Sequence, residues 1–494
     1  RTAIVALRSP AQAAGAGRRS DPAETLARYA PLVSDWDRFV AALRAPRPTC
    51  LVANRARLDR EALAALLAAE GWPAVPVAWT EDALRVPAEA RPGLWWPGRV
   101  GLYQIQEEAS LLPVALLAPA PGESVLDLCA APGGKAAQIA LAVGPQGTVV
   151  ANDRDTRRLS AVRDKMKRLG LANLSTTAHN GGEWPLGCGG FDRVLVDAPC
   201  SAEGTNAAKG AAYASASARF RAHLGRQQRA LLRRALDLVR PGGRVVYATC
   251  SLAPEENEAV VAEVLAEAGD AVSVVPVALP GLDSAPGLDA WAGTRFPARL
   301  RHAHRLWPER TGTGGFFAVA LTRRPDVAIP ETPAAFGPPG GEAPEMADGL
   351  AVLRRHFGLP DTAFEGLRFL ARGEEIQIVT AAHRLPPRPA VVSSGLPLTR
   401  RGGAWPKPTT AAALWLGAAA RRNVVALDRA QRDAYLARRP VTPRPDQRAA
   451  CDAKGYVVVT HAGVPLGLAL QRPGPPPWLE SAFPRIWADQ PPAT

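Results

Sequence analysis

The chain contains 494 residues, with a formal net charge of +13 and a pI near 10.0. This length predicts two or three domains, and the charge favours a polyanionic partner, first of all nucleic acid, although an Arg-, Ala- and Pro-rich composition also fits a GC-rich genome. No uninterrupted apolar run reaches the ~20 residues of a membrane span, so we expect no membrane association. The six cysteines include no CxxC pair, which argues against a metal site or a disulfide framework and fits a reducing cytoplasm.

The N-terminal region is expected to contain a disordered end followed by a small α/β module at 21–98. Residues 1–20 are basic and rich in Ala but lack an apolar core with a cleavage site, so we interpret them as disordered. Hydrophobic spacing predicts one or two helices in 22–43, a strand at 49–54, a helix at 59–70 and a strand at 76–79. The turn GLWWPG at 93–98 carries two Trp side chains, which we expect to pack against a neighbouring domain rather than to stack on bases.

Strands and helices alternate regularly in residues 99–323, which we predict to be the main domain. The pattern predicts an amphipathic helix at 101–118, strands at 124–128, 148–152, 174–178, 192–199, 244–250 and 316–323, helices at 135–143, 156–169 and 219–239, and a helix opening at 254. This alternation predicts an α/β fold with a mostly parallel, doubly wound sheet. Ligands of such sheets bind outside the carboxyl ends of the strands, where the strand order reverses.

The stretch SVLDLCAAPGGK at 124–135 has the pattern of a strand, a tight glycine turn and a helix start. Gly133 and Gly134 let backbone N–H groups approach a ligand, and the helix start favours a negatively charged group such as a carboxylate. The alternative is a purely structural turn, because glycine turns follow strands in many α/β proteins. The residues at the other strand ends favour the ligand site.

Polar side chains follow five of the predicted strands. They are Asp127, Asp153, Asn180, Asp197 with Cys200, and Cys250. Each alone is explained as a cap or turn residue, but together they predict one site along the carboxyl edge. Asp153 comes about 20 residues after the glycine turn, the spacing of an acid that binds a nucleoside ribose, and the absence of GxGxxG favours S-adenosylmethionine over a dinucleotide.

Cys200 and Cys250 at this edge indicate covalent catalysis. Carbon 5 of a pyrimidine becomes nucleophilic after a thiolate adds to carbon 6, and a second Cys can assist loss of the carbon-5 proton and release of the thiol. Asp197 is expected to hydrogen-bond the cytosine amino group and nitrogen 3. The pattern alone does not decide which Cys attacks. The remaining cysteines are interpreted as small buried hydrophobic residues, namely Cys50, Cys129, Cys188 and Cys451.

Four ordered motifs resemble those of the Nol/Nop/Sun family of RNA cytosine-5 methyltransferases, and the segment GLYQIQEEAS is similar to that family's lead-in. The motifs are DLCAAPGGK, ANDRDTRR, DAPCSAEGT and YATCSLAPEENEAVV, and the match spans roughly 101–323. The resemblance implies a Rossmann-like class I methyltransferase core at 99–323. It also implies that Cys250 is the nucleophile and that Cys200 serves product release. Analogy with DNA cytosine methyltransferases, whose nucleophile follows Pro, favours Cys200 as the nucleophile instead.

The same resemblance implies S-adenosylmethionine as the cofactor and places Asp197 near both the methyl donor and the target base. The implied cofactor-binding residues are Cys129, Ala130, Ala131, Pro132, Gly133, Gly134, Lys135, Asp153, Arg158, Asn180 and Asp197. Three positions depart from the family pattern. Asn180 replaces an acid near the adenine, Ala202 replaces the usual Gly after Cys-Ser, and Lys209 is the lone cation of TNAAKG, where relatives carry a more basic run. The first departure predicts weaker cofactor binding.

The region that follows resembles the C-terminal part of bacterial RsmF-type enzymes, which modify small-subunit ribosomal RNA. RLWPERTGTGGFFAVAL at 305–321 resembles the end of their catalytic domain, and a Pro/Gly-rich linker is predicted at 324–345. Residues 346–494 are expected to form an α+β, PUA-like RNA-binding region with a helix at 350–357 and a hairpin at 456–470.

The sequence therefore predicts a cytoplasmic, monomeric RNA cytosine-5 methyltransferase with RNA-binding modules at 21–98 and 346–494 and ribosomal RNA as its substrate. Two alternatives stay open. Transfer RNA is the alternative substrate, because the catalytic motifs do not discriminate between the two RNAs. A non-catalytic RNA-binding ribosome-assembly factor is the alternative function, although intact Cys200, Cys250 and Asp197 argue against it.

Overall fold

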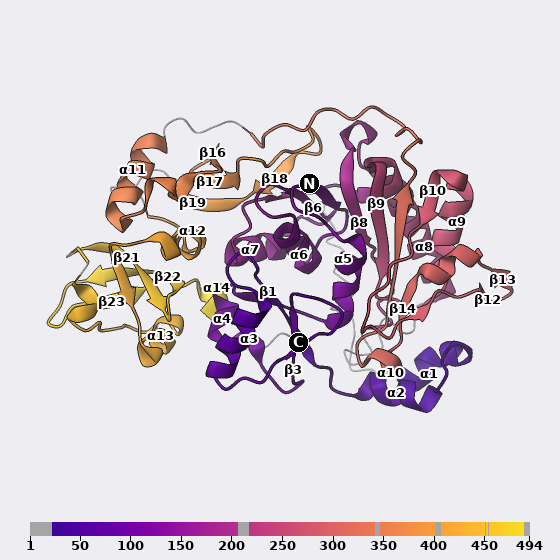
Figure 1. The fold of residues 1–494 in the computed structure, drawn as a ribbon, viewed down its shortest axis with the longest axis horizontal. Helices are drawn as coiled ribbons and strands as arrows, with labels where there is room; N and C mark the ends of the chain where they lie inside the picture. The colour runs from indigo at the N-terminus through magenta and orange to yellow at the C-terminus, as the bar shows by residue number, and fades with distance from the viewer. Residues whose placement is uncertain are drawn as a thin grey trace, which may run out of the picture.

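The computed structural model describes residues 22–205, 217–340, 346–400, 407–449, 451–452 and 454–488. In Figure 1 the two C-terminal sheets lie at the left, a smaller N-terminal sheet lies at the lower centre, and a large central sheet extends from the upper centre to the right. The predicted disordered segment 1–20, Lys209 and residues 341–345 of the predicted linker lie outside the described residues. Within the described ranges, no helix combines the length and the apolar character that crossing a membrane requires.

A ten-stranded sheet forms the centre of the described part of the chain. Its strands, in spatial order, are β11 (Ala285–Pro286), β14 (His304–Leu306), β15 (Phe316–Arg323), β9 (Val239–Thr249), β8 (Phe191–Asp197), β5 (Ser124–Asp127), β6 (Thr148–Asn152), β7 (Leu174–Thr177) and β18 (Val391–Ser394), with β10 (Val272–Val274) beside β15. The strands from β9 to β7 run parallel, which confirms the predicted doubly wound α/β fold. The strand order reverses at β5, which lies between β6 and β8, so a ligand crevice is expected at its carboxyl end.

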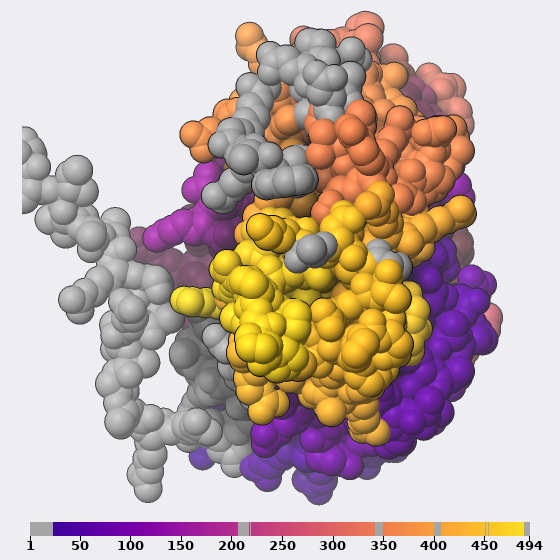
Figure 2. Space-filling view, turned by 90° about the vertical axis from the view of Figure 1, so that its left-hand side faces the viewer, coloured from indigo at the N-terminus to yellow at the C-terminus, as the bar shows by residue number. Residues whose placement is uncertain are grey.

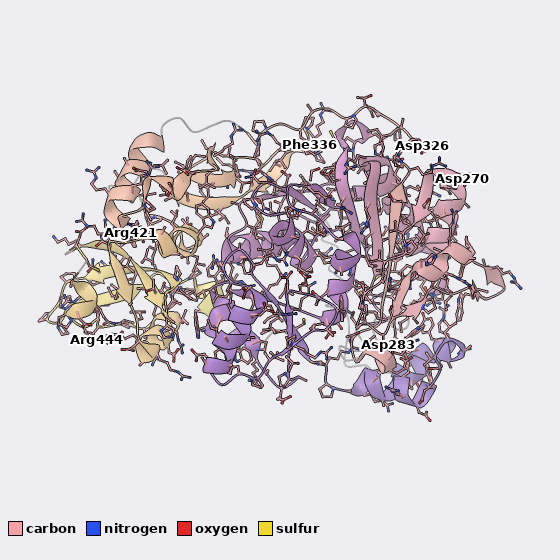
Figure 3. The ribbon with its side chains drawn as sticks, viewed as in Figure 1. Asp270, Asp283, Asp326, Phe336, Arg421 and Arg444 are labelled. Atoms are coloured by element: carbon pink, nitrogen blue, oxygen red, sulfur yellow. The ribbon has the colours of Figure 1, made fainter. Side chains whose placement is uncertain are left out.

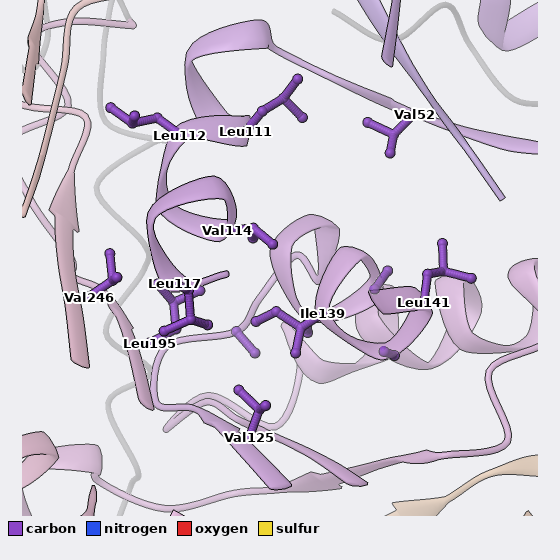
Figure 4. Packing of buried hydrophobic residues seen from close by; sticks show 14 of the residues in the cluster. Val52, Leu111, Leu112, Val114, Leu117, Val125, Ile139, Leu141, Leu195 and Val246 are labelled. Atoms are coloured by element: carbon purple, nitrogen blue, oxygen red, sulfur yellow. The ribbon is translucent and has the colours of Figure 1, made fainter. Parts of the chain in front are cut away.

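Helices cover both faces of this sheet because successive strand residues point to opposite sides. The helices are α5 (Leu112–Leu117), α6 (Gly134–Val143), α7 (Leu159–Leu169), α8 (Ala218–Leu238) and α9 (Glu258–Ala268). Val125, Leu195 and Val246 form one buried cluster with α5, α6 and α7 (Figure 4). Leu126 and Val194 point the other way and pack with α8 and α9. The sheet therefore has a buried core on each face, which fixes the strand ends that carry the predicted site.

The N-terminal sheet has the strand order β2-β3-β1-β4 and packs on α3. The bounds are β1 (Thr49–Ala53), α3 (Arg60–Ala69), β2 (Val75–Pro76), β3 (Ala83–Val86) and β4 (Tyr103–Gln106). The predicted helix at 101–118 is wrong over its first part, because β4 pairs with β1 and the chain becomes helical only at Glu108. The predicted strand at 76–79 is wrong beyond Pro76, where β2 ends. In the sheet, β3 lies between β2 and β1 and pairs with β1. Non-local strand pairing overrides local spacing in both cases.

An N-terminal arm formed by α1 (Pro22–Leu26) and α2 (Trp36–Arg44), as the helical spacing predicted, packs on the domain of the central sheet rather than on the N-terminal sheet (Figure 1). Tyr29 and Phe39 of this arm are fully buried in a cluster with Leu252 and Trp307. Short α10 (Pro308–Thr311) lies against α2. The arm thus covers the segment that directly follows Cys250.

The C-terminal region contains a three-stranded and a four-stranded sheet among the described residues. Its elements are α11 (Met346–Phe357), β16 (Leu367–Arg372), β17 (Glu375–Thr380), β19 (Leu396–Arg400), α12 (Thr410–Leu416), β20 (Val424–Ala426), α13 (Arg429–Leu436), β21 (Gly455–His461), β22 (Val464–Arg472), β23 (Trp478–Ser481) and α14 (Arg485–Ala488). The pairing of β21 with β22 confirms the predicted hairpin, and α11 confirms the predicted helix.

Two of the contacts between the C-terminal region and the rest of the chain show how this region is held. Trp96, which begins α4 (Trp96–Arg99), is 4% exposed and packs against His461 and the guanidinium of Arg432, where the C-terminal and N-terminal regions adjoin (Figure 2). The expected packing of the Trp pair against a neighbouring domain is confirmed for Trp96, whereas Trp95 stacks on Trp72 of the N-terminal module.

The second contact lies along the described part of the predicted linker. The Phe336 ring packs edge-on against Phe191 with centroids 5.0 Å apart (Figure 3), and the Ala334 N–H donates to the Gly187 carbonyl at 2.8 Å. Further on, β18 pairs antiparallel with β7 and extends the central sheet. The chain therefore returns from the far edge of the sheet across its surface before it forms the C-terminal sheets.

Candidate functional site

The glycine turn follows β5 and leads directly into α6, as the sequence predicts. Gly133 has a φ of +94°, and a Cβ there would lie 3.1 Å from the Val162 Cα, so the position requires glycine for both reasons. The loop is held from β6, because the Ala130 N–H donates to the Asn152 carbonyl at 2.7 Å. Within the loop Ala130 and Ala131 are buried, whereas Pro132 is exposed.

Four predicted cofactor residues line one pocket at the carboxyl edge, namely Cys129, Asp153, Arg158 and Asn180. Asp153 is 3% exposed, and the Arg158 Nη1 lies 3.1 Å from its Oδ2. The same guanidinium donates to the Ala131 carbonyl at 2.7 Å and so joins the acid to the glycine turn. Asn180 Oδ1 accepts from the Gly182 N–H at 3.2 Å, which explains why an amide serves as a cap at this position.

Asp127 lies beneath this pocket and is 1% exposed. Burial, followed by the charge of Asp197, raises the pKa of Asp127 to about 8. Its Oδ2 has no hydrogen-bond partner among the described residues. Buried polar groups are normally paired, so an unpaired acceptor at the reversal of strand order indicates a ligand that donates there.

Cys200 and Cys250 lie at the ends of the neighbouring strands β8 and β9, with their Sγ atoms 3.3 Å apart. A hydrogen bond from Cys200 lowers the pKa of Cys250 against the effect of burial, and the Thr205 hydroxyl and the Lys135 charge act in the same direction. The same contact with Cys250 and burial raise the pKa of Cys200. Within the pair, the surroundings therefore favour a thiolate on Cys250 over one on Cys200.

Lys135 pairs with Asp197 and does not line the pocket that holds Asp153. Its Nζ lies 2.7 Å from Asp197 Oδ2, and its side chain is 12% exposed. Burial alone would lower the pKa of Lys135, but the charge of Asp197 and the hydrogen bond to it raise the value. The strand ends therefore bring a largely buried cation and a partly exposed acid beside Cys250.

The other cysteines are placed away from the thiol pair. The interpretation as buried hydrophobic residues is confirmed for Cys50 and Cys188, whereas Cys129 and Cys451 are only partly buried. Among the described residues, no three His, Cys, Asp or Glu side chains gather as metal ligands would.

Sequence reasoning missed two buried acids next to the cysteines. Glu256, which is fully buried, hydrogen-bonds Ser201 and Ser251, the residues that follow the two cysteines. Glu203 accepts a hydrogen bond from the Tyr29 hydroxyl of the N-terminal arm. Both acids stand inside the quoted motifs DAPCSAEGT and YATCSLAPEENEAVV, but only the fold shows what they contact.

Comparison with known proteins is consistent with this geometry. Residues 114–322 match the family model described as 16S rRNA methyltransferase RsmB/F. A mouse protein named 28S rRNA (cytosine-C(5))-methyltransferase is 35% identical over 306 residues, which cover 60% of this chain and 38% of that protein. Ribosomal RNA small subunit methyltransferase F of Klebsiella pneumoniae is 31% identical over 307 residues, which cover 60% of this chain and 62% of that protein. The chain thus spans less than two thirds of the length of either relative.

A solved structure shares the fold as well. The crystal structure of a methyltransferase homolog protein from Pyrococcus horikoshii aligns with a TM-score of 0.51 and 29% identity, and the alignment covers 61% of this chain and 99% of that one. The shared part is a class I methyltransferase fold, as the resemblance of the motifs implied, and its α/β sheet is the one that the alternation of strands and helices predicted.

Proposed function

We propose that this chain, which belongs to the RsmB/F methyltransferase family through its residues 114–322, is an S-adenosylmethionine-dependent RNA cytosine-5 methyltransferase that acts on small-subunit ribosomal RNA. The observation that carries the proposal is the thiol pair, because two Cys side chains with Sγ atoms 3.3 Å apart and opposite pKa shifts suit attack on carbon 6 followed by release. The activities for which these relatives are named support ribosomal RNA as the substrate class.

The pocket next to the glycine turn fits the proposed cofactor. Asp153 offers a buried carboxylate for ribose hydroxyls, and the unpaired Oδ2 of Asp127 suits an N–H donor of the ligand. Arg158 already holds the Asp153 carboxylate against the turn, so the acceptor is oriented before any ligand binds. When bound, S-adenosylmethionine supplies an electrophilic methyl group on its sulfonium sulfur.

Three side chains of this chain then act on the cytosine, each in a different step. The Cys250 thiolate forms a bond to carbon 6, which makes carbon 5 nucleophilic. Asp197, held by Lys135, accepts a hydrogen bond from the cytosine amino group and, when it carries a proton, donates that proton to nitrogen 3, which neutralises the negative charge that develops there on addition. For release, Cys200 takes the carbon-5 proton and gives its own proton to the Cys250 sulfur as the carbon–sulfur bond breaks. Cys200 thus regains its proton, and Cys250 returns to the thiolate by losing one proton to solvent.

We also propose that the regions on both sides of the core contact the RNA backbone, residues 21–98 on one side and 346–494 on the other. Residues 346–494 contain 20 Lys and Arg against 11 Asp and Glu, which supports this for the C-terminal side, because cations that neutralise phosphates position an RNA without reading its sequence. A flipped or unpaired cytosine then enters the site from the carboxyl edge of the sheet.

Transfer of a labelled methyl group to RNA tests the proposed function. The purified chain is incubated with labelled S-adenosylmethionine in three separate reactions. One contains small-subunit ribosomal RNA, one large-subunit ribosomal RNA and one transfer RNA. We expect label in 5-methylcytosine of the small-subunit RNA, at a position that bisulfite sequencing of a deletion strain identifies. Label only in transfer RNA would select the alternative substrate. Cofactor binding by calorimetry without transfer to any RNA would select the non-catalytic alternative.

A further inference from the structure

We propose that Glu256 is a positioning residue that sets the separation of the two reactive sulfurs. The proposal rests on the function proposed above, because it concerns the thiols of that reaction. Glu256 lies in the segment between Cys250 and α9 and is fully buried. It touches neither sulfur, so it acts through the residues that follow the two cysteines in the chain.

Both cysteine loops are hydrogen-bonded to this one carboxylate. Its Oε1 accepts from the Ser201 hydroxyl at 2.5 Å and from the Ser251 hydroxyl at 2.9 Å. Its Oε2 accepts from the Ser201 N–H at 3.0 Å and from the Gln228 amide at 2.9 Å. Ser201 follows Cys200, and Ser251 follows Cys250, so the carboxylate joins two loops that come from different strands.

The distance between these loops matters for the chemistry. During release the proton of Cys200 passes to the Cys250 sulfur, and such a transfer requires the two atoms to stay within hydrogen-bond reach. The separation of 3.3 Å meets this condition. A direct Ser201–Ser251 hydroxyl contact at 2.9 Å, a backbone bond from the Gly204 N–H to the Cys250 carbonyl and the hydrogen bond between Thr205 and Cys250 also join the loops. Among these links, the carboxylate is the group that holds both serines at once, so its loss should let the sulfurs move apart.

The hydrogen-bond pattern distinguishes a positioning role from a role of the charge. A Gln at this position can keep all four contacts, because its amide NH2 can donate to the two hydroxyl oxygens while its carbonyl accepts from the Ser201 N–H and Gln228. An Ala keeps none of them. We therefore expect Glu256→Gln to retain the geometry of the thiol pair and Glu256→Ala to lose it.

Phenylarsine oxide provides a readout that needs neither RNA nor methyl transfer, because it binds two thiols at once only when their sulfurs are close. The full chain and its variants are mixed with the reagent, and formation of the doubly bound adduct is followed by intact mass and by protection of Cys200 and Cys250 from alkylation. We expect the unmodified chain and Glu256→Gln to react at the same rate and Glu256→Ala about tenfold more slowly. Release should follow the same order, so that covalent RNA adduct accumulates in Glu256→Ala.

Two further variants keep the experiment decisive. Ser251→Ala removes one hydrogen bond to the carboxylate and should form the adduct more slowly than the unmodified chain, by less than tenfold. This comparison tests the proposal even if Glu256→Ala does not fold. Glu108→Ala removes another buried acid, which is bonded to Trp79 and Arg85 and to neither cysteine loop, and should lower stability without changing the arsenical reaction.

Two results would overturn the positioning role: equal loss in Glu256→Gln and Glu256→Ala, or an arsenical rate in both Glu256→Ala and Ser251→Ala that matches the unmodified chain. If the unmodified chain methylates no RNA but the arsenical rates follow the expected order, the proposed function fails while the positioning of the sulfurs stands.

Discussion

Lys135 and Asp197 form an ion pair at 2.7 Å although they are 62 residues apart in the sequence. The pair exists because the glycine turn after β5 and the end of the adjacent β8 meet at the same edge of the sheet. The Lys135 ammonium also lies 5.5 Å from the centroid of the Phe316 ring, which helps to exclude water. A single cation therefore faces both the acid proposed to hold the base and the thiolate of Cys250.

Replacing this cation should raise the pKa of Cys250. In Lys135→Met the thiolate loses a favourable charge and still faces Asp197, so we expect the pKa of Cys250 to shift upward. The rate of iodoacetamide alkylation of Cys250 as a function of pH measures the shift. Lys167→Met, on α7, is the control and should leave the profile unchanged. An unaltered alkylation profile in Lys135→Met would show that Lys135 does not activate the thiol.

The two cysteines should fail in different ways when they are replaced by Ala. Cys250→Ala is expected to abolish methyl transfer, because no thiolate adds to carbon 6. Cys200→Ala is expected to form the bond but not to release it, so the chain remains attached to its RNA. Denaturing gels of each variant mixed with RNA reveal the attached species. An adduct in Cys250→Ala but not in Cys200→Ala would reverse the assigned roles.

Glu203 should make stability fall as the pH rises. Burial raises the pKa of Glu203 from its ordinary value of 4.5 to about 7, so the folded chain holds this proton more tightly than the unfolded chain. The resulting stability is complete below pH 4.5 and is lost as the pH rises through 7, by about 2 kcal/mol between pH 5 and 8. Glu203→Gln cannot ionise and should lack this part of the pH dependence. Denaturant titrations of the unmodified chain and of Glu203→Gln measure this difference. The same pH dependence in the two proteins would show that ionisation of Glu203 does not lower stability.

His383 should have the opposite effect. It is fully buried where β18 joins β7, and its Nε2 lies 2.7 Å from the Ser175 hydroxyl. Burial lowers the pKa of His383 from 6.5 to about 3, so the unfolded chain takes up a proton first. Stability is therefore present above pH 6.5 and is lost below it, by about 2 kcal/mol at pH 5. Unfolding of His383→Gln, measured from pH 5 to 7, should show a flatter dependence than the unmodified chain.

The sequence predicted best those elements whose signal is local. β15 spans Phe316–Arg323, the predicted range, because a continuous apolar run defines a strand that is buried on both faces. The glycine turn and the polar strand ends were likewise visible, since each follows directly from its strand. β4 was missed because its residues also fit helical spacing, and only its pairing with β1 makes it a strand.

Local sequence patterns could not predict the contacts between distant residues that organise the site. Ser201 and Glu256 are 55 residues apart, so nothing in either motif reveals that one hydrogen-bonds the other. The preference for Cys250 over Cys200 as nucleophile came from family resemblance alone, whereas the structure adds a physical reason, the cation and the hydroxyl on the side of Cys250. The contact between Tyr29 and Glu203 likewise depends on where the arm folds.

The antiparallel pairing of β18 with β7 has a practical consequence for anyone who divides this protein. A fragment that stops after β15 would leave the outer backbone N–H and C=O groups of β7 unpaired, and open strands of this kind recruit other chains. It would also strip the cover from Ser175, which now contacts Ser394 at 2.8 Å. The isolated methyltransferase domain should therefore self-associate, because in the full chain β18 of the C-terminal region pairs with the β7 edge of the central sheet and keeps other strands from it.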